Sequence, residues 1–194
     1  LLYWPQSLLP LMARSWAVTP AAASGLIATS TMAMAVMLIP ASLLSDRFGR
    51  KNIMSLAMLL AALFTLAMAF ATSFHALLVL RFLTGLVLAG LPAVAMTYLS
   101  EEVESTALAS AMGLYISGTA LGGMSGRLLS AWAAESWGSA GAALTVGLCG
   151  LLAAIGFLLC LPASRQFHAR LLPLTRAGRQ AWRSSLLQLL RDPA

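Results

Sequence analysis

The chain has 194 residues, of which 60% are hydrophobic and only 9% are charged, and its formal net charge is +6. A water-soluble domain carries about 25% charged residues, so this composition excludes a soluble globular protein. The apolar content far exceeds what one soluble core needs, which indicates a chain embedded in lipid.

Five segments of the chain contain no Asp, Glu, Lys or Arg, at 15–45, 52–80, 82–100, 105–126 and 136–164. Each can hold a bilayer-spanning helix, which needs roughly 17–25 mostly apolar residues. Transmembrane β-strands would instead alternate apolar and polar residues over about ten positions, and runs such as 56–71 do not alternate. The sequence therefore predicts an all-α membrane protein.

The expected helices follow one another with short connections. The chain opens at Leu1 in an apolar run too short to span a bilayer, and we interpret residues 1–13 as the end of a first helix whose start is missing. Thr19 and Pro20 have the residue types that begin a helix. Spanning helices are expected at about 21–44, 52–71, 76–98, 107–129 and 139–161, which makes residues 1–162 a six-helix bundle with helix 1 truncated.

The segment 163–194 has a different character from the rest of the chain. Within it, Trp182, Leu186, Leu189 and Leu190 recur at helical spacing, while the basic residues fall largely elsewhere. This pattern predicts a basic amphipathic helix at the inner membrane surface. We interpret the segment as a cytoplasmic linker, also truncated.

Arginine and lysine predict the sidedness of the bundle. One basic cluster follows the second expected helix, and a second follows the sixth, so both lie on one side if the helices alternate. The 2–3 loop, the 4–5 loop and the C-terminal tail are therefore expected in the cytoplasm, with Arg14, His75 and Glu135 outside. This topology explains the net positive charge without a nucleic-acid partner.

The 2–3 loop, SLLSDRFGRKNIM at 42–54, carries the clearest motif. Gly49 can adopt the backbone angles that a tight turn requires. Asp46 lies at the C-terminal end of its helix, where the helix dipole disfavours a negative charge, so it should seek a cation or another helix's N-terminus. Arg50 and Lys51 can bind headgroups or pair with acids. A simple positive-inside turn is the alternative interpretation.

A charged residue, Arg81, is expected inside the fourth helix. A charge within a span costs about 2.5–3.5 kcal/mol, so it needs a polar cavity, a partner or the interface. Snorkelling to the interface is the alternative to a cavity role. Gly85 lies one turn away and leaves room around Arg81, and Pro92 can bend the helix. The candidates for lining a cavity are the polar side chains of otherwise apolar helices: Tyr3, Gln6, Arg81 and Tyr115, each of which could instead serve packing.

The fifth expected helix repeats glycine every four residues, at Gly118, Gly122 and Gly126, with Gly123 beside them. Such a stripe lets another backbone approach closely. Helix packing is therefore its physical role in any interpretation.

These motifs together resemble those of the major facilitator superfamily. The sequence Asp46-Arg47-Phe48-Gly49-Arg50-Lys51 is similar to the signature loop of that family, and the Arg81 to Gly85 spacing resembles its helix-4 motif, whose arginine is associated with proton coupling. The glycines of the fifth helix resemble the antiporter motif, although Thr119 stands where a proline is usual. Segments 96–102, 112–118 and 122–128 look close to bacterial inner-membrane transporters and resemble the drug:proton antiporter-1 family.

The resemblance implies the N-terminal half of a twelve-helix transporter in the bacterial cytoplasmic (inner) membrane. Its implied partners are the lipid bilayer, a small-molecule substrate such as a drug or sugar, protons, and the missing C-terminal half of the same protein. In the family the loop stabilises the inward-closed state, with its Asp at a helix N-terminus of the other half and its Arg paired with acids near the end of helix 4. The acids at that place here are Glu101, Glu102 and Glu104.

The resulting prediction is secondary active transport, as proton-coupled efflux, by the full-length protein, with this half inactive alone. A non-transporting membrane bundle, such as an assembly factor, is the alternative, and it would lack a central cavity between helices 1, 2, 4 and 5. An integral-membrane enzyme would need grouped His, Asp or Cys at membrane depth, whereas His75 and His168 both fall outside the expected spans. No enzyme activity, cofactor or metal is expected.

Overall fold

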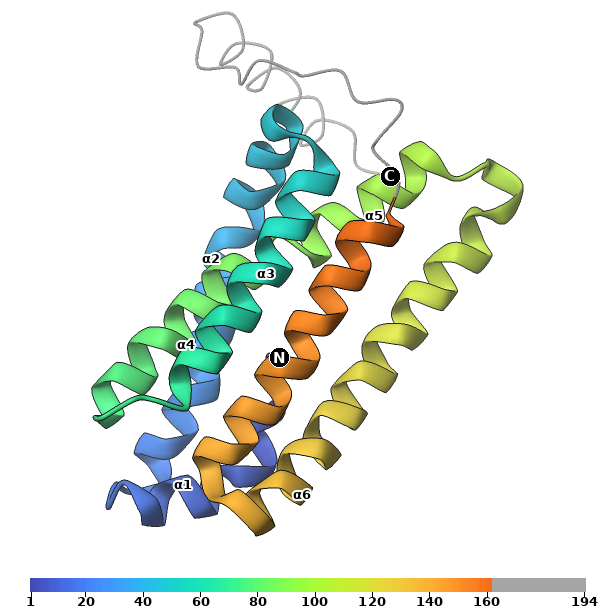
Figure 1. Ribbon diagram of the computed structural model, residues 1–194. Helices are drawn as coiled ribbons and strands as arrows, with labels where there is room; N and C mark the ends of the chain where they lie inside the picture. Colours follow the sequence, from blue (N-terminus) through green and yellow to red (C-terminus); the bar gives the residue numbers. More distant parts are fainter. Residues whose placement is uncertain (162–194) are drawn as a thin grey trace, which may run out of the picture.

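The computed structural model describes residues 1–161, and the predicted linker lies outside the described residues. All regular structure in the described part is helical, and Figure 1 shows the helices gathered into one bundle. The elements in chain order are the 3-10 helix η1 (Trp4–Leu8) and the α-helices α1 (Leu9–Ser15), α2 (Pro20–Phe48), α3 (Arg50–Met68), α4 (Phe74–Leu88), α5 (Pro92–Glu102) and α6 (Ser105–Cys160).

Four stretches of the described residues are long and apolar enough to cross a membrane: α2, α3, α4 together with α5, and α6. The expectation of an all-α membrane protein agrees with this finding. The count of six helices and the truncation of the first stay predictions.

The helix α6 has 56 residues, which would extend about 84 Å if it were straight. A bilayer core is about 30 Å thick, so one straight span cannot use this length. The helix turns back at Gly138, whose φ of 66° and ψ of −168° are not helical, and its two parts run antiparallel in Figure 1. The sequence predicted a loop of several residues at this place, and the structure reduces it to this one glycine.

The break between α4 and α5 comes from Pro92. A proline has no backbone N–H to continue the ladder, and the residues before it form tighter i→i−3 bonds, from Gly90 N to Val87 O (3.1 Å) and from Leu91 N to Leu88 O (3.1 Å). The helix expected at 76–98 is thus divided in two, as the position of Pro92 suggested. Gly90 lies at this break, and a Cβ there would come within 3.1 Å of the Ala57 Cβ.

The first residues form two short helices instead of the one remnant expected at 1–13. A turn with Ala17 at φ 50° then leads into α2. Thr19 caps α2, since its side-chain oxygen accepts a hydrogen bond from the Ala22 N–H at 3.2 Å, and Pro20 takes the first helical position. The predicted start of this helix is confirmed.

Small residues allow the helices to pack closely. Such packing is expected in a membrane, because lipid tails are as apolar as the side chains and the helices must associate through close contact. The backbones of α2 and α4 meet at Ser30 and Gly85, and α6 meets Leu66 of α3 at Gly147. We call the end of the bundle that holds the α2–α3 turn the loop end. One buried cluster, around Trp4 and Met68, lies at the opposite end, and a second cluster, around Met54, lies nearer the loop end.

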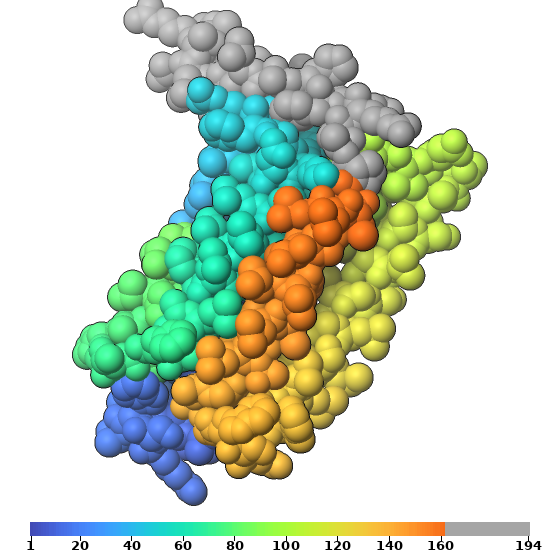
Figure 2. Space-filling view, in the orientation of Figure 1, coloured from blue at the N-terminus to red at the C-terminus, as the bar shows by residue number. Residues whose placement is uncertain are grey.

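The first part of α6, up to about Arg127, runs at one edge of the bundle in Figures 1 and 2. Tyr115 packs against the buried cluster around Met54, but the glycines of this part have no neighbours. A Cβ built at Gly118, Gly122 or Gly126 would meet no atom within 4 Å. The stripe of glycines therefore has no packing partner among residues 1–161.

The predicted sidedness can be checked with single cysteines in a background without Cys149 and Cys160. Arg14 and Glu135 are exposed at the end opposite the loop, so cysteines there should react with a membrane-impermeant thiol reagent added outside intact cells. A cysteine at Glu102 should stay unlabelled until the cells are opened. Labelling in the reverse order would show that the basic clusters do not lie in the cytoplasm.

Candidate functional site

The α2–α3 turn consists of a single residue, Gly49. Its φ of 92° lies in the region that side chains disfavour, which agrees with the dihedral freedom expected of this glycine. The Gly49 N–H donates to the Ser45 carbonyl at 3.0 Å, and the Gly49 carbonyl accepts from the Ile53 N–H at 3.2 Å. The two helices therefore join with both backbone groups of the glycine satisfied.

The Arg50 guanidinium connects three helices at the loop end. Its Nε and Nη2 donate to the two carboxylate oxygens of Glu101 at the end of α5, at 2.5 and 2.6 Å. Its Nη1 lies 3.2 Å from Asp46 Oδ1 and 3.3 Å from Ser45 Oγ, both on α2. This two-pronged pairing is the strongest geometry available to an arginine and a carboxylate. We call Asp46, Arg50 and Glu101 the charge cluster.

The other charged residues of the two loops lie outside this charge cluster. Lys51 donates through Nζ to the carbonyl of Leu161, just beyond the end of α6. Arg47 is exposed, with its guanidinium carbon 5.4 Å from the Phe48 ring centroid. Of the three acids considered from the sequence, only Glu101 bonds to Arg50, while Glu102 is half-buried and Glu104 is exposed before α6. The roles of these residues in transport stay predictions.

Arg81 is buried at 1% exposure and makes four hydrogen bonds. Two tie it to α2: Nε donates to the Leu26 carbonyl at 3.0 Å, and Nη2 donates to Ser30 Oγ at 2.8 Å. The other two go to the carbonyls of Leu1 (3.3 Å) and Leu2 (2.5 Å). The side chain thus bonds within the bundle, and among residues 1–161 it has no acidic partner.

Gly85 explains how Arg81 reaches α2. A Cβ at this position would overlap the Ser30 carbonyl oxygen and would lie 2.8 Å from Ser30 Cα. Only glycine allows the two backbones this close approach, which brings Ser30 Oγ within reach of the guanidinium one turn away. The room around Arg81 that the sequence suggested is therefore filled by the backbone of α2.

Changing Arg81 separates a hydrogen-bonding role from snorkelling. Lysine keeps the charge but lacks the planar guanidinium group, which can donate to several acceptors at once. Because one hydrogen bond to a charged group contributes about 1.5–3 kcal/mol, Arg81→Lys should lower transport by the complete carrier roughly tenfold, and Arg81→Ala should lower it further.

The matched control for that experiment is Arg127, which is exposed and bonds to the Gly123 carbonyl at 3.2 Å and to Gln6 Oε1 at 3.4 Å. Its Lys and Ala variants should transport at near the wild-type rate. Equal transport rates for wild type, Arg81→Lys and Arg81→Ala, at equal amounts of protein in the membrane, would remove Arg81 from the site.

The remaining cavity candidates do not come together. Gln6 is exposed and meets Arg127, and Tyr3 is 44% exposed near the chain segment that Arg81 contacts. Tyr115 packs instead against the buried cluster around Met54. The structure therefore groups Arg81 with Ser30 and backbone carbonyls, and it leaves Tyr115 apart from them.

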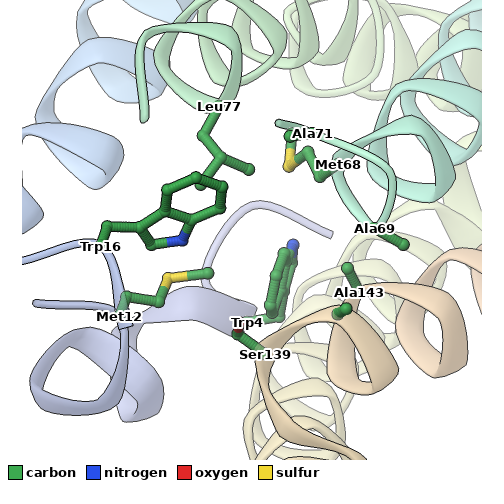
Figure 3. Close-up of a pocket in the computed structure, with 10 residues that line it drawn as sticks. Trp4, Met12, Trp16, Met68, Ala69, Ala71, Leu77, Ser139 and Ala143 are labelled. Atoms are coloured by element: carbon green, nitrogen blue, oxygen red, sulfur yellow. The ribbon is translucent and has the colours of Figure 1, made fainter. Parts of the chain in front are cut away.

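A small pocket of about 70 Å³ lies at the end opposite the loop, between α1, α3, α4 and the second part of α6 (Figure 3). Trp4, Met12, Trp16, Met68 and Leu77 line it. The Trp4 indole nitrogen is buried and has no hydrogen-bond partner in the described residues, and Figure 3 shows it at the tip of a ring that is seen edge-on. Drug-sized ligands need about 300–1,000 Å³, so this cavity has room for water and not for such a substrate.

Two serines that bind the buried arginines could not be recognised from the sequence. Ser30 and Ser45 are small polar residues in a long apolar helix, and both are fully buried beside an arginine. A serine in a membrane helix can satisfy its hydroxyl on its own backbone, as Ser30 also does with the Ile27 carbonyl. Burial of the serines with an arginine becomes visible only from the packing of α2.

Comparison with known proteins gives matches over nearly the whole chain. A family model described as Major Facilitator Superfamily matches residues 3–194. The uncharacterized MFS-type transporter YybF of Bacillus subtilis (strain 168) is 45% identical over 192 residues, which are 99% of this chain and 46% of that protein.

Two further relatives carry more specific names. The inner membrane transport protein YnfM of Escherichia coli (strain K12) is 43% identical over 168 residues, 87% of this chain and 40% of that protein. The 4-hydroxybenzoate transporter PcaK of Pseudomonas putida is 33% identical over 159 residues, 81% of this chain and 35% of that protein. The chain thus spans less than half the length of each of these relatives.

Proposed function

The chain belongs to the Major Facilitator Superfamily, and from this we propose that it is the N-terminal half of a secondary active transporter that exports a small molecule in exchange for protons. Membrane transport in general is supported by the named relatives and by the apolar helices. The direction of transport, the coupling to protons and the status as one half are parts of the proposal. The inner membrane of a bacterium is the proposed location, as in the name of YnfM.

The observation that carries the proposal is the charge cluster. Arg50 holds α2, α3 and α5 together at one end of the bundle, while Asp46 keeps 34% of its side chain exposed. One oxygen of Asp46 faces Arg50, so the exposed part of the carboxylate is available to a group outside residues 1–161, such as a helix N-terminus. A contact that forms in one conformation and breaks in the other is what an alternating carrier needs.

Coupling to protons needs a titrating group. The carboxylates of residues 1–161 lie at helix ends or near turns, at 46, 101, 102, 104 and 135, and not at mid-span. We therefore place the titrating carboxylate of the proposed mechanism in the remainder of the complete protein. Arg81 is the charge that this half contributes at membrane depth.

A second candidate substrate is a small organic anion, and the name of one relative favours it. Arg81 is buried and makes four hydrogen bonds within the bundle, so it would contribute its positive field to such a site and not a direct contact. The relative PcaK is named for 4-hydroxybenzoate, which is a carboxylic acid. Under this second hypothesis, the fold and the charge cluster are the same, and the transported substrate is an organic anion.

The test is flux measured with the complete carrier in proteoliposomes under an imposed pH gradient. The panel of substrates contains lipophilic cations, sugars and 4-hydroxybenzoate. Asp46→Asn is the control variant, because it should insert into the membrane normally but lacks the negative charge of the Asp46 carboxylate. Gradient-dependent flux of a cation or sugar supports drug or sugar export, and flux of the benzoate supports the anionic cargo. No flux of any compound above the control would favour a non-transporting bundle.

The 194-residue chain alone is expected to show no flux in the same assay. A carrier of this superfamily holds its substrate between two halves that rock against each other, and the chain covers less than half of its relatives. Reconstitution at equal protein mass should give only the leak of empty liposomes. Gradient-dependent flux by this chain that Asp46→Asn abolishes would contradict the assignment as one half.

A further inference from the structure

We propose that a groove between α2 and α3, near the loop end, is a binding site for an anionic phospholipid, with one acyl chain in the groove and the phosphate on Arg47. The groove measures about 330 Å³, and its floor is formed by α4 where that helix ends. Its walls are almost entirely apolar, and the side chains used below are Met37 and Leu44 of α2 and Ile53, Leu56 and Leu60 of α3. The inference does not depend on transport.

The groove has the dimensions and the surroundings of an acyl-chain site. A methylene occupies about as much space as a water molecule, ~30 Å³, so the groove holds about ten of them. Both of its walls belong to helices apolar enough to span the membrane, and its rim is open, with Leu44 37% and Leu56 51% exposed. Left empty in a bilayer, these walls would lose dispersion contacts that a lipid chain restores.

Arg47 provides the charge that selects the lipid. It lies one turn beyond Leu44, so its side chain starts within about 5–6 Å of the groove wall. Its guanidinium lies over the exposed ring of Phe48, and Asn52 donates to the Phe48 carbonyl at 3.0 Å, which ties the mouth of the groove to α3. An arginine in this arrangement can bind a phosphate with two parallel hydrogen bonds.

The other cations of the loop are already occupied. Arg50 pairs with Glu101 and Asp46, and Lys51 donates to the Leu161 carbonyl. Arg47 makes no ion pair with any residue of the described chain, although it is exposed at the loop end. Lys51 is held by a neutral carbonyl and Arg50 by two carboxylates, so Arg47 is the exposed cation that lies directly beyond the end of the acyl-chain groove. A lipid headgroup with a net negative charge complements it, whereas a zwitterionic headgroup brings its own cation.

The experiment counts and titrates bound lipid by native mass spectrometry of the complete carrier in detergent. The probes are phosphatidylglycerol and phosphatidylcholine with identical acyl chains, and glycerol phosphate serves as a probe of the headgroup alone. Wild type should bind phosphatidylglycerol at least fivefold more tightly than phosphatidylcholine. Arg47→Gln should weaken phosphatidylglycerol roughly tenfold, as expected for the loss of a hydrogen bond to a charged group, and Leu56→Trp, which fills the groove from its open rim, should weaken both lipids.

Matched controls lie on the first part of α6. Arg127→Gln removes an exposed arginine and Leu121→Trp enlarges an exposed leucine away from the groove, and both should bind lipid like wild type. Weakening by Arg47→Gln and Leu56→Trp beyond these controls supports the site. Equal affinity in all four variants, or competition by glycerol phosphate alone that Leu56→Trp leaves unchanged, would overturn it. A circular dichroism melt of each variant confirms that the comparison is made on folded protein.

Discussion

Replacing Gly85 with alanine is expected to lower the thermal stability of the folded protein strongly. The added Cβ would lie 2.8 Å from both the carbonyl carbon and the Cα of Ser30, and it would overlap the carbonyl oxygen. Backbone atoms cannot rotate away as a flexible side chain can, so α2 and α4 must separate. Overpacking of this kind typically costs 1–3 kcal/mol, sometimes more, and separation also weakens the bond from Arg81 to Ser30.

The matched control for Gly85 is Gly156, which lies in the second part of α6. A Cβ at Gly156 meets no atom within 4 Å, so Gly156→Ala should be neutral or slightly stabilising, since alanine is favoured over glycine in a helix by about 1 kcal/mol. The measurement is the thermal unfolding midpoint in detergent, together with the fraction of monodisperse protein on gel filtration. A midpoint for Gly85→Ala equal to that of Gly156→Ala would show that α2 and α4 do not approach so closely.

The second large effect is expected from neutralising the charge cluster. Glu101→Gln keeps the shape of the side chain but ends the two-pronged pairing with Arg50. The side chain of Glu101 is 34% exposed, so solvent screening lowers the value of the pair, and we expect a coupling of about 1–2 kcal/mol. A change of 1.4 kcal/mol shifts a conformational equilibrium tenfold, so the transport rate should fall about tenfold while insertion stays normal.

A double-mutant cycle isolates this pairing. Arg50→Gln and the double variant with Glu101→Gln should be equally impaired, because either change already removes the bond. Glu104→Gln, which changes an exposed acid of the same connector, should transport like wild type. Additive losses in the double variant, or an impaired Glu104→Gln, would mean that net charge at this face matters and that the bond itself does not.

Local features of this structure could be predicted well from the sequence. Long apolar helices follow from the length of the uncharged segments, although the number of spans stays a prediction. The start of α2 follows from Thr19 and Pro20, because a cap needs only neighbouring residues. Gly49 was expected to turn the chain, and Pro92 to disturb its helix, for the same local reasons. These elements depend on backbone chemistry within one turn.

Features that depend on how helices meet could not be predicted. The choice of Glu101 over its two neighbouring acids requires the rotation of α5 about its axis relative to α3. The partners of Arg81 are mostly backbone carbonyls, such as that of Leu26, and a carbonyl carries no mark in the sequence. The reduction of the expected loop to Gly138 reflects how far each part of α6 continues, which is the least certain quantity in any assignment from periodicity.

The hydrogen bonds of Arg81 also imply an order of assembly during synthesis. The bonds to Leu26 and Ser30 connect residues that have all been made once α4 is complete, so α2 and α4 can lock together while later helices are still on the ribosome. After α5, the first part of α6 emerges, and its glycine face finds no partner among residues 1–161. The hydrogen-bonded pair of α2 and α4 can therefore form early, whereas the insertion machinery or the surrounding lipid must cover the glycine face of the first part of α6.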